Sequence, residues 1–463
     1  MRLIHLSKLR YPVAALLLLP GISWASGFAL IEQSVSSMGT AYANGSAGMD
    51  DASTIFFNPA SMSRLQGRNV SGGLHVLHSS TDVDSKGFYN PDNPAIAFTG
   101  LGGVSTGGNG KDDISLTAAV PHGGYSHQLN DRMWAGLSIN GPFGLKTKYD
   151  KDWVGRYHAI KSDLKTVNIN PSFAYEINDK ASVGVGVSAL YADGELTNAV
   201  DGGLSTLLVG SVPPGTAPFF WAPGSTNLDS EAKLTGDDWG YGWNVGMMLE
   251  PVPGTRIGLH YRSKIDLTLE GDARVTGPLV DFTNDAELAV TLPANASLSA
   301  LHALNSKWTV MADLTWTNWD KLDELRVKID PSGNNTLPQK RSVTPLKWDN
   351  AIRVAVGASY RHNATWLFRS GVAYDETPVP KDSLRTPRVP DADRIWLTFG
   401  ANYRYSEALT FDVGYAHLFV DDPELNSDSS FDSSGGQTNG FHKVRGDYDA
   451  AVDILSAQVN WNF

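Results

Sequence analysis

The last nine residues of the chain alternate strictly between apolar and polar side chains. Leu455, Ala457, Val459, Trp461 and Phe463 share one face, and the residues between them are Ser, Gln or Asn. Because successive side chains of a strand point to opposite faces, this segment predicts a β-strand with one apolar and one amide-rich face. Such a strand suits a membrane barrel wall between lipid and a polar lumen, although a strand of a soluble β-sandwich shows the same alternation.

The same alternation recurs about fourteen times after residue 67, and an even count fits bacterial single-chain barrels. The connections alternate between tight turns, such as Asn130-Asp131, and long polar or Gly/Pro-rich stretches, such as 200–229. Short periplasmic turns and long outer loops are typical of outer-membrane barrels. We therefore predict an all-β fold, a transmembrane antiparallel β-barrel over residues 68–463. The predicted strands begin near Arg68, Ser115, Met133, Leu164, Ala181, Ser230, Thr255, Asp285, Lys307, Lys347, Thr365, Asp393, Leu409 and Asp447.

Aromatic residues follow several of the predicted short turns. Trp134, Trp308 and Trp366 each lie two or three residues beyond such a turn. This is where the aromatic girdle of a membrane interface is expected, so we predict that the three indoles face lipid. The alternative is that they are ordinary core tryptophans.

The N-terminus has the pattern of a secretory signal peptide over residues 1–25. Basic residues precede the apolar run Val13 to Leu19, and the small residues Ser23 and Ala25 suit cleavage before Ser26. The apolar run is too short to span a bilayer, which takes about 20 residues. The predicted location is the bacterial outer membrane, reached by export.

Composition and motifs exclude several function classes. The formal net charge of −12 disfavours nucleic acid as a partner, and the chain has no cysteine for a disulfide framework. Gly103-Val104-Ser105-Thr106-Gly107 lacks the following helix of a hydrolase nucleophile, and the eleven histidines show no metal-ligand spacing. We expect neither an enzyme nor a bound metal or cofactor.

Two segments depart from the simple barrel pattern. Residues 26–67 lack strand alternation but carry apolar residues such as Phe28 and Leu30, which predicts a hatch that enters the lumen as a plug rather than a disordered leader. Within the third predicted strand, Pro142 cannot donate to a ladder, and the flanking glycines favour a bulge or kink. We therefore expect a local break in the wall there.

These features together resemble the FadL family of long-chain fatty acid outer-membrane transporters (OmpP1/FadL/TodX type), over nearly all of the chain after the signal peptide. The motifs that carry the resemblance are Ser26-Gly27-Phe28, Asn58-Pro59-Ala60, Pro142-Phe143-Gly144-Leu145, Gly371-Val372-Ala373-Tyr374-Asp375, Pro378-Val379-Pro380 and Pro390-Asp391-Ala392-Asp393-Arg394-Ile395-Trp396-Leu397.

The resemblance implies a fourteen-stranded barrel with an N-terminal hatch, a hydrophobic pocket and a lateral exit through the kinked third strand. It also implies cations that hold a carboxylate, but Asn198 and Asp349 stand where the family places an arginine and a lysine. Lys347 and Arg353 remain candidates for that role, or are ordinary lumenal or interfacial cations. The residues expected in binding or gating are Phe28, Leu30, Asn58, Pro59, Ala60, Pro142, Phe143, Gly144, Leu196, Lys347 and Arg353.

The leading functional hypothesis is a monomer that takes long-chain fatty acids, or other hydrophobic molecules, across the outer membrane into its lipid. Family members that carry aromatic or aliphatic hydrocarbons leave that cargo open as an alternative. A general porin for hydrophilic solutes is a further alternative, which the apolar hatch opposes, and an outer-membrane hydrolase is the last.

We predict that the exported protein begins at Ser26, because Ser23 and Ala25 suit the signal peptidase. N-terminal sequencing of protein extracted from outer membranes checks this, and retention of Met1 there would contradict the export argument.

Overall fold

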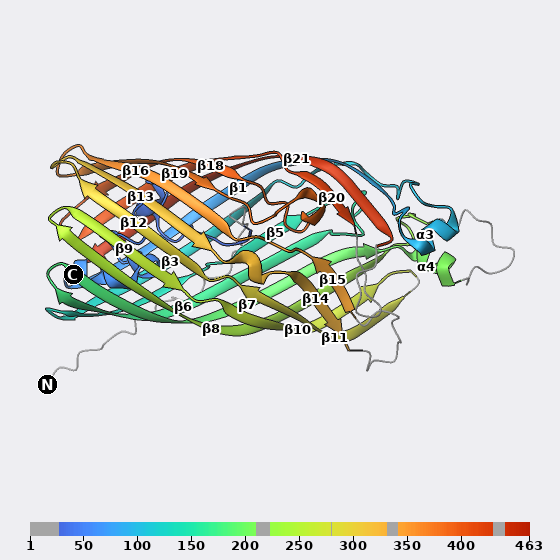
Figure 1. The fold of residues 1–463 in the computed structure, drawn as a ribbon, viewed down its shortest axis with the longest axis horizontal. Coiled ribbons are helices and arrows are strands. Elements are labelled where there is room, and N and C mark those ends of the chain that lie inside the picture. Colours follow the sequence, from blue (N-terminus) through green and yellow to red (C-terminus); the bar gives the residue numbers. More distant parts are fainter. Residues whose placement is uncertain (1–26, 210–222, 279, 331–340, 429–439) are drawn as a thin grey trace, which may run out of the picture.

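The computed structural model describes residues 27–209, 223–278, 280–330, 341–428 and 440–463, so the predicted signal peptide and Ser26 lie outside the described residues. One antiparallel sheet closes on itself (Figure 1). The first strand, β1 (Arg68–Tyr89), pairs with β3 (Leu116–Asn130) on one side and with the last strand, β21 (His442–Asn462), on the other. The chain is therefore a closed barrel, as predicted.

The wall consists of fourteen strands, several of them interrupted once. In chain order they are β1, β3, β4 (Met133–Asn140) with β5 (Gly144–Lys148), β6 (Lys161–Asn178), β7 (Ala181–Val200), β8 (Ser230–Val252), β9 (Thr255–Arg262) with β10 (Ile265–Thr276), β11 (Asp281–Leu292) with β12 (Asn295–Ala303), β13 (Trp308–Thr317) with β14 (Glu324–Ile329), β15 (Arg341–Pro345) with β16 (Ala351–Arg361), β17 (Trp366–Asp375), β18 (Arg394–Arg404), β19 (Leu409–Val420) and β21. Two short strands, β2 (Lys111–Asp113) and β20 (Glu424–Asp428), extend the sheet on β1 and β21.

The alternation of the last strand is confirmed in β21. Ser456 and Gln458 are buried inside the barrel, whereas Leu455, Val459 and Trp461 face outward. The tight turns gather at the end of the barrel that carries the C-terminus, and the long connections lie at the other end with α3 (Pro94–Thr99) and α4 (Gly202–Val209) (Figure 1). The predicted asymmetry between the two rims is present.

The prediction for the three tryptophans is right for two of them. Trp308 and Trp366 are exposed on the outer wall, but Trp134 is only 2% exposed and faces inward. Its indole donates a hydrogen bond to the Leu65 carbonyl oxygen at 2.7 Å. Distance from a turn does not decide which face a side chain takes, and here the neighbouring Met133 holds the outward position.

The N-terminal segment, residues 27–67, lies inside the barrel near the rim that carries the tight turns and the C-terminus (Figure 1). It contains α1 (Val35–Met38), α2 (Thr54–Phe57) and the 3-10 helix η1 (Pro59–Arg64), and most of its residues are buried. The helices are short because Ser, Gly and Asn interrupt them. No helix in the described part of the chain is long and apolar enough to cross a membrane.

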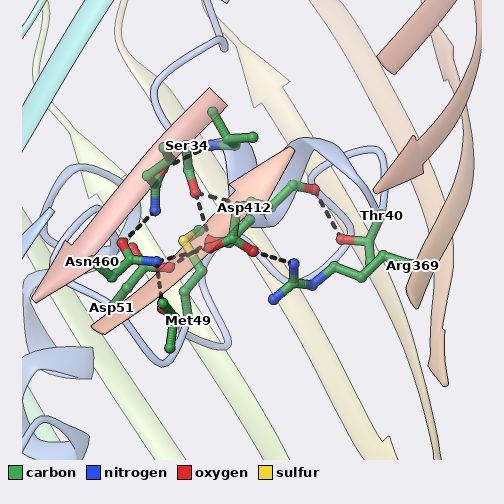
Figure 2. A network of polar contacts seen from close by, with 12 residues as sticks. Ser34, Thr40, Met49, Asp51, Arg369, Asp412 and Asn460 are labelled. Carbon is green, nitrogen blue, oxygen red and sulfur yellow. Dashed lines mark hydrogen bonds and ion pairs between the residues drawn. The ribbon is translucent and has the colours of Figure 1, made fainter. Parts of the chain in front are cut away.

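Polar side chains of the wall hold this segment through a chain of hydrogen bonds (Figure 2). Arg369 forms an ion pair with Asp412, and the Asn460 amide donates to the Asp412 carboxylate at 2.7 Å. Gln458 donates to Asn460 and accepts from the backbone N–H of Val35 at 2.9 Å. The Gln458 amide thus satisfies the backbone N–H of Val35, and Asn460 and Asp412 hold that amide in place.

The outward face of β21 predicts a depth-dependent tolerance for charge. Val459 lies four residues from the C-terminus, roughly 13 Å along the strand, so Val459→Arg places a cation near the middle of the apolar band and costs about 2–4 kcal/mol. Asn462→Arg, at the rim and on the opposite, amide-rich face, is the control for both depth and face. We expect heat-modifiable gel migration of outer-membrane fractions to show impaired assembly for Val459→Arg alone, and equal assembly of both variants contradicts the assignment.

Candidate functional site

The barrel wall is incomplete where the third strand is interrupted. β4 and β5 both pair with β6, but β3 pairs with β4 only from Gly123 onward. Residues 116–122 of β3 and residues 144–148 of β5 therefore face each other without a hydrogen-bond ladder. Pro142 has no N–H to offer, and the N–H of Phe143 donates instead to the Thr166 hydroxyl at 3.1 Å. The expected break is confirmed as a gap in pairing between β3 and β5.

A cavity lies at this gap. It has about 580 Å³ of space between side chains, counting its open mouth. Leu30 of the N-terminal segment lines it together with residues of the three strands around the gap, among them Val120, Ile139, Phe143 and Leu164. We call this cavity the wall opening.

The N-terminal segment pairs with the kinked strand across the wall opening. The N–H of Leu30 donates to the Pro142 carbonyl at 2.8 Å, and the N–H of Gly144 donates to the Phe28 carbonyl at 3.0 Å. Ala29 and Phe143 are antiparallel bridge partners between these two bonds. Residues 28–30 thus act as a short strand on the inner side of the unpaired edge.

A larger apolar cavity lies on the other side of Phe28, and we call it the main pocket. It has about 740 Å³ of space between side chains, again counting its mouth. The Phe28 ring stands 4.9 Å from the Trp319 ring and 5.9 Å from the Trp348 ring. The apolar residues that line the main pocket are Phe28, Leu145, Leu164, Leu196, Leu234, Leu269, Leu288, Val290, Leu325, Leu346, Trp348 and Val389. Leu164 lines both cavities.

Three ionisable side chains also line the main pocket. Asp163 and Glu195 both pair with Lys161, at 3.4 and 3.2 Å. The third is Arg388, in the connection between β17 and β18. Burial lowers the pKa of Arg388 to about 10, against a smaller opposing effect of Tyr149, so its guanidinium stays cationic at neutral pH.

The Asn58-Pro59-Ala60 motif lies outside both cavities and anchors the N-terminal segment to the wall. The Asn58 amide donates to the carbonyls of Ser46 and Met247 at 2.7 and 3.1 Å, and its oxygen accepts from the N–H of Ala60. Gly246 makes this approach possible, since a Cβ there would stand 1.9 Å from the Asn58 side-chain oxygen. The motif therefore fixes where the segment sits.

The predicted residues fall into three groups. Phe28 and Leu196 line the main pocket; Leu30, Phe143 and Gly144 line the wall opening, where Pro142 accepts the Leu30 N–H; Asn58, Pro59 and Ala60 form the anchor.

The two predicted cations are outside the main pocket lining. Lys347 is exposed, although its neighbours Leu346 and Trp348 line the pocket. Arg353 is buried against the N-terminal segment, where it donates to the Ala41 carbonyl at 3.0 Å.

Sequence reasoning missed Arg388. Its guanidinium donates to the side-chain oxygen of Asn198 at 3.2 Å, so it reaches the very position where an arginine was expected. Two features of the sequence could have pointed to Arg388. It lies two residues before the Pro390-Asp391 motif, and residue 198, where the family places an arginine, is not a cation.

A closed fourteen-strand barrel with a lumenal segment, an apolar pocket and a gap in its wall defines an outer-membrane transport protein for hydrophobic molecules. A sequence model described as "Outer membrane protein transport protein (OMPP1/FadL/TodX)" matches residues 16–463, and the chain belongs to this family. Members of the family are transporters or channels rather than enzymes.

Individual relatives agree with this assignment. The chain is 31% identical over 412 residues to the "Long-chain fatty acid transport protein" of Escherichia coli O6:H1, covering 86% of this chain and 87% of that protein. A crystal structure of a Pseudomonas aeruginosa FadL homologue matches with a TM-score of 0.78 and 25% identity, over 94% of this chain and all of that chain. The structure of the Pseudomonas putida toluene transporter TodX matches with a TM-score of 0.62 and 17% identity, over 90% of this chain and 95% of that one, which shows the fold alone.

The anchor generates a prediction about conductance. Gly246→Ala pushes Asn58 away from the wall and loosens the N-terminal segment, so we expect larger and more frequent current steps in planar bilayers. Gly72→Ala in β1 is the control, because a Cβ at Gly72 meets nothing within 4 Å. Identical traces for the two variants would show that Asn58 does not hold the segment.

Proposed function

We propose that the chain carries long-chain fatty acids across the outer membrane by binding them in the main pocket and releasing them sideways through the wall opening. The observation that carries the proposal is the adjacency of the two cavities. Leu164 lines both, and residues 28–30 stand between them. A ligand that displaces these residues passes from the pocket to the gap between β3 and β5 and leaves into lipid.

Apolar molecules cross the polar outer face of the membrane poorly. An apolar pocket stabilises an alkyl chain by about 0.8 kcal/mol per buried methylene. An exit through the wall then spares the ligand from entering water. The aliphatic and aromatic lining of the main pocket supports this sequence of events.

Residues 26–67 serve as the hatch in this proposal. Hydrogen bonds to wall amides, the Asn58 anchor and burial in the lumen support that role for the described residues 27–67. A lumen filled in this way argues against an open porin for hydrophilic solutes. The chain acts on its cargo without catalysing a reaction, as a monomer whose outward apolar face contacts lipid all round.

We propose fatty acids as the cargo because the relative from Escherichia coli is named a long-chain fatty acid transport protein. The likeness to the toluene transporter is too distant in sequence to argue for hydrocarbons. The binding proposal is tested by equilibrium binding of palmitate to purified protein, and absence of binding at micromolar ligand would overturn it.

The exit is tested by restoring to the third strand the backbone N–H that Pro142 lacks. Pro142→Val with Gly144→Val favours continuous pairing with β3, so we expect normal assembly and palmitate binding but strongly reduced uptake by cells. Pro171→Val is the control, because Pro171 lies in β6, where the wall is paired with β4. An assembled double variant that takes up palmitate at the parental rate contradicts lateral exit at the kink.

A further inference from the structure

We propose that Arg388 binds the carboxylate of a long-chain acid at the extracellular end of the main pocket, so that the alkyl tail points toward the wall opening and leaves first. The inference rests on the proposed function and adds to it the head-group chemistry, the residue that recognises it and the orientation of the cargo.

Arg388 is a buried cation whose contacts are all with neutral oxygens. It is 8% exposed. One terminal nitrogen donates to the carbonyls of Lys161 and Thr197 at 3.3 and 3.4 Å and to the Ser162 hydroxyl at 3.4 Å, and the other donates to Asn198 at 3.2 Å. These contacts lie at or beyond the long end of the N–H···O range.

Buried charges in proteins are normally paired with an opposite charge. Across the described residues, however, no carboxylate lies within 4 Å of the Arg388 guanidinium. The two acids that line the main pocket already have cationic partners: Asp163 contacts Lys161 and Lys165, and Glu195 contacts Lys161 and Lys233. A ligand carboxylate would supply the missing counter-charge, and planar guanidinium matches it with two parallel hydrogen bonds.

The order of contacts along β6 sets the orientation. Ser162, near the extracellular start of the strand, touches Arg388; Leu164 lines both cavities; Thr166 bonds to the kinked strand. At about 3.3 Å per residue, Ser162 and Thr166 are roughly 13 Å apart. A carboxylate held at Arg388 therefore directs its tail toward Phe28 and the wall opening.

The backbone around Arg388 is fixed independently of its side chain. The Tyr149 hydroxyl donates to the Pro387 carbonyl at 2.8 Å, and the Thr147 hydroxyl donates to the Arg388 carbonyl at 3.3 Å. Replacing the guanidinium with an uncharged chain of similar length leaves these contacts in place, so Arg388→Met is a suitable variant.

The test compares palmitate with 1-hexadecanol, which has the same chain length and no charge, by equilibrium binding to full-length protein in detergent. We expect Arg388→Met to weaken palmitate binding about 10- to 100-fold, the loss of a hydrogen-bonded charge contact, and to leave hexadecanol binding within about 2-fold. Arg388→Lys should restore part of the palmitate affinity. The exposed Lys347, replaced by Met, is the matched control and should leave both affinities unchanged.

Unchanged palmitate binding by Arg388→Met, or equal losses for both ligands, overturns the role of Arg388 while the proposed function stands. A parental protein that binds neither ligand overturns the proposed function itself. Orientation is read separately with palmitate carrying a photoreactive diazirine at its terminal carbon. Adducts at residues 28–30 or 143–145 support tail-first exit, and adducts at residues 385–389 overturn it.

Discussion

Between β3 and β5 the barrel wall lacks a hydrogen-bond ladder, and residues 28–30 form two backbone hydrogen bonds to the kinked strand from the inside. Within a bilayer an unpaired backbone edge is costly, because no water satisfies its polar groups. The N-terminal segment must therefore be held at one place and in one register. The hydrogen bonds that converge on it and the close approach at Gly246 serve this need.

The proposed lateral exit requires this seal to open. Two backbone hydrogen bonds contribute about 1 kcal/mol each to stability, and Phe28 and Leu30 add apolar contact. On either side of them, the Gly27 N–H donates to the Asp391 carboxylate at 3.0 Å and the Gln33 amide donates to the Gly141 carbonyl at 2.8 Å. An alkyl chain that enters the main pocket offers apolar contact of the same kind. The segment is also held farther along the chain, at Val35 and Asn58, so the proposed exit requires only residues 28–30 to move.

Much of the fold was predictable because the side chains of a strand alternate with a period of two, which identifies the strands. Asn and Gly residues in the tight turns mark where each strand ends. Pro142 identified the kink because proline lacks the N–H that a strand needs for pairing. The face of Trp134 was predicted wrongly, because the distance of a residue from a turn does not determine whether its side chain faces inward or outward. Arg388 was missed because its role depends on distant segments: its own connection and the ends of β6 and β7 converge only in the folded barrel.

The most direct test of the account is to lock residues 28–30 onto the kinked strand. Ala29 and Phe143 are bridge partners at the short spacing of a non-hydrogen-bonded pair, which suits a disulfide, and the chain has no cysteine of its own. Uptake of palmitate is measured in cells that carry the variant with Ala29→Cys and Phe143→Cys, oxidised and then reduced, beside each single variant. The account predicts that uptake stops in the oxidised state and returns on reduction. Equal uptake in both states would contradict it.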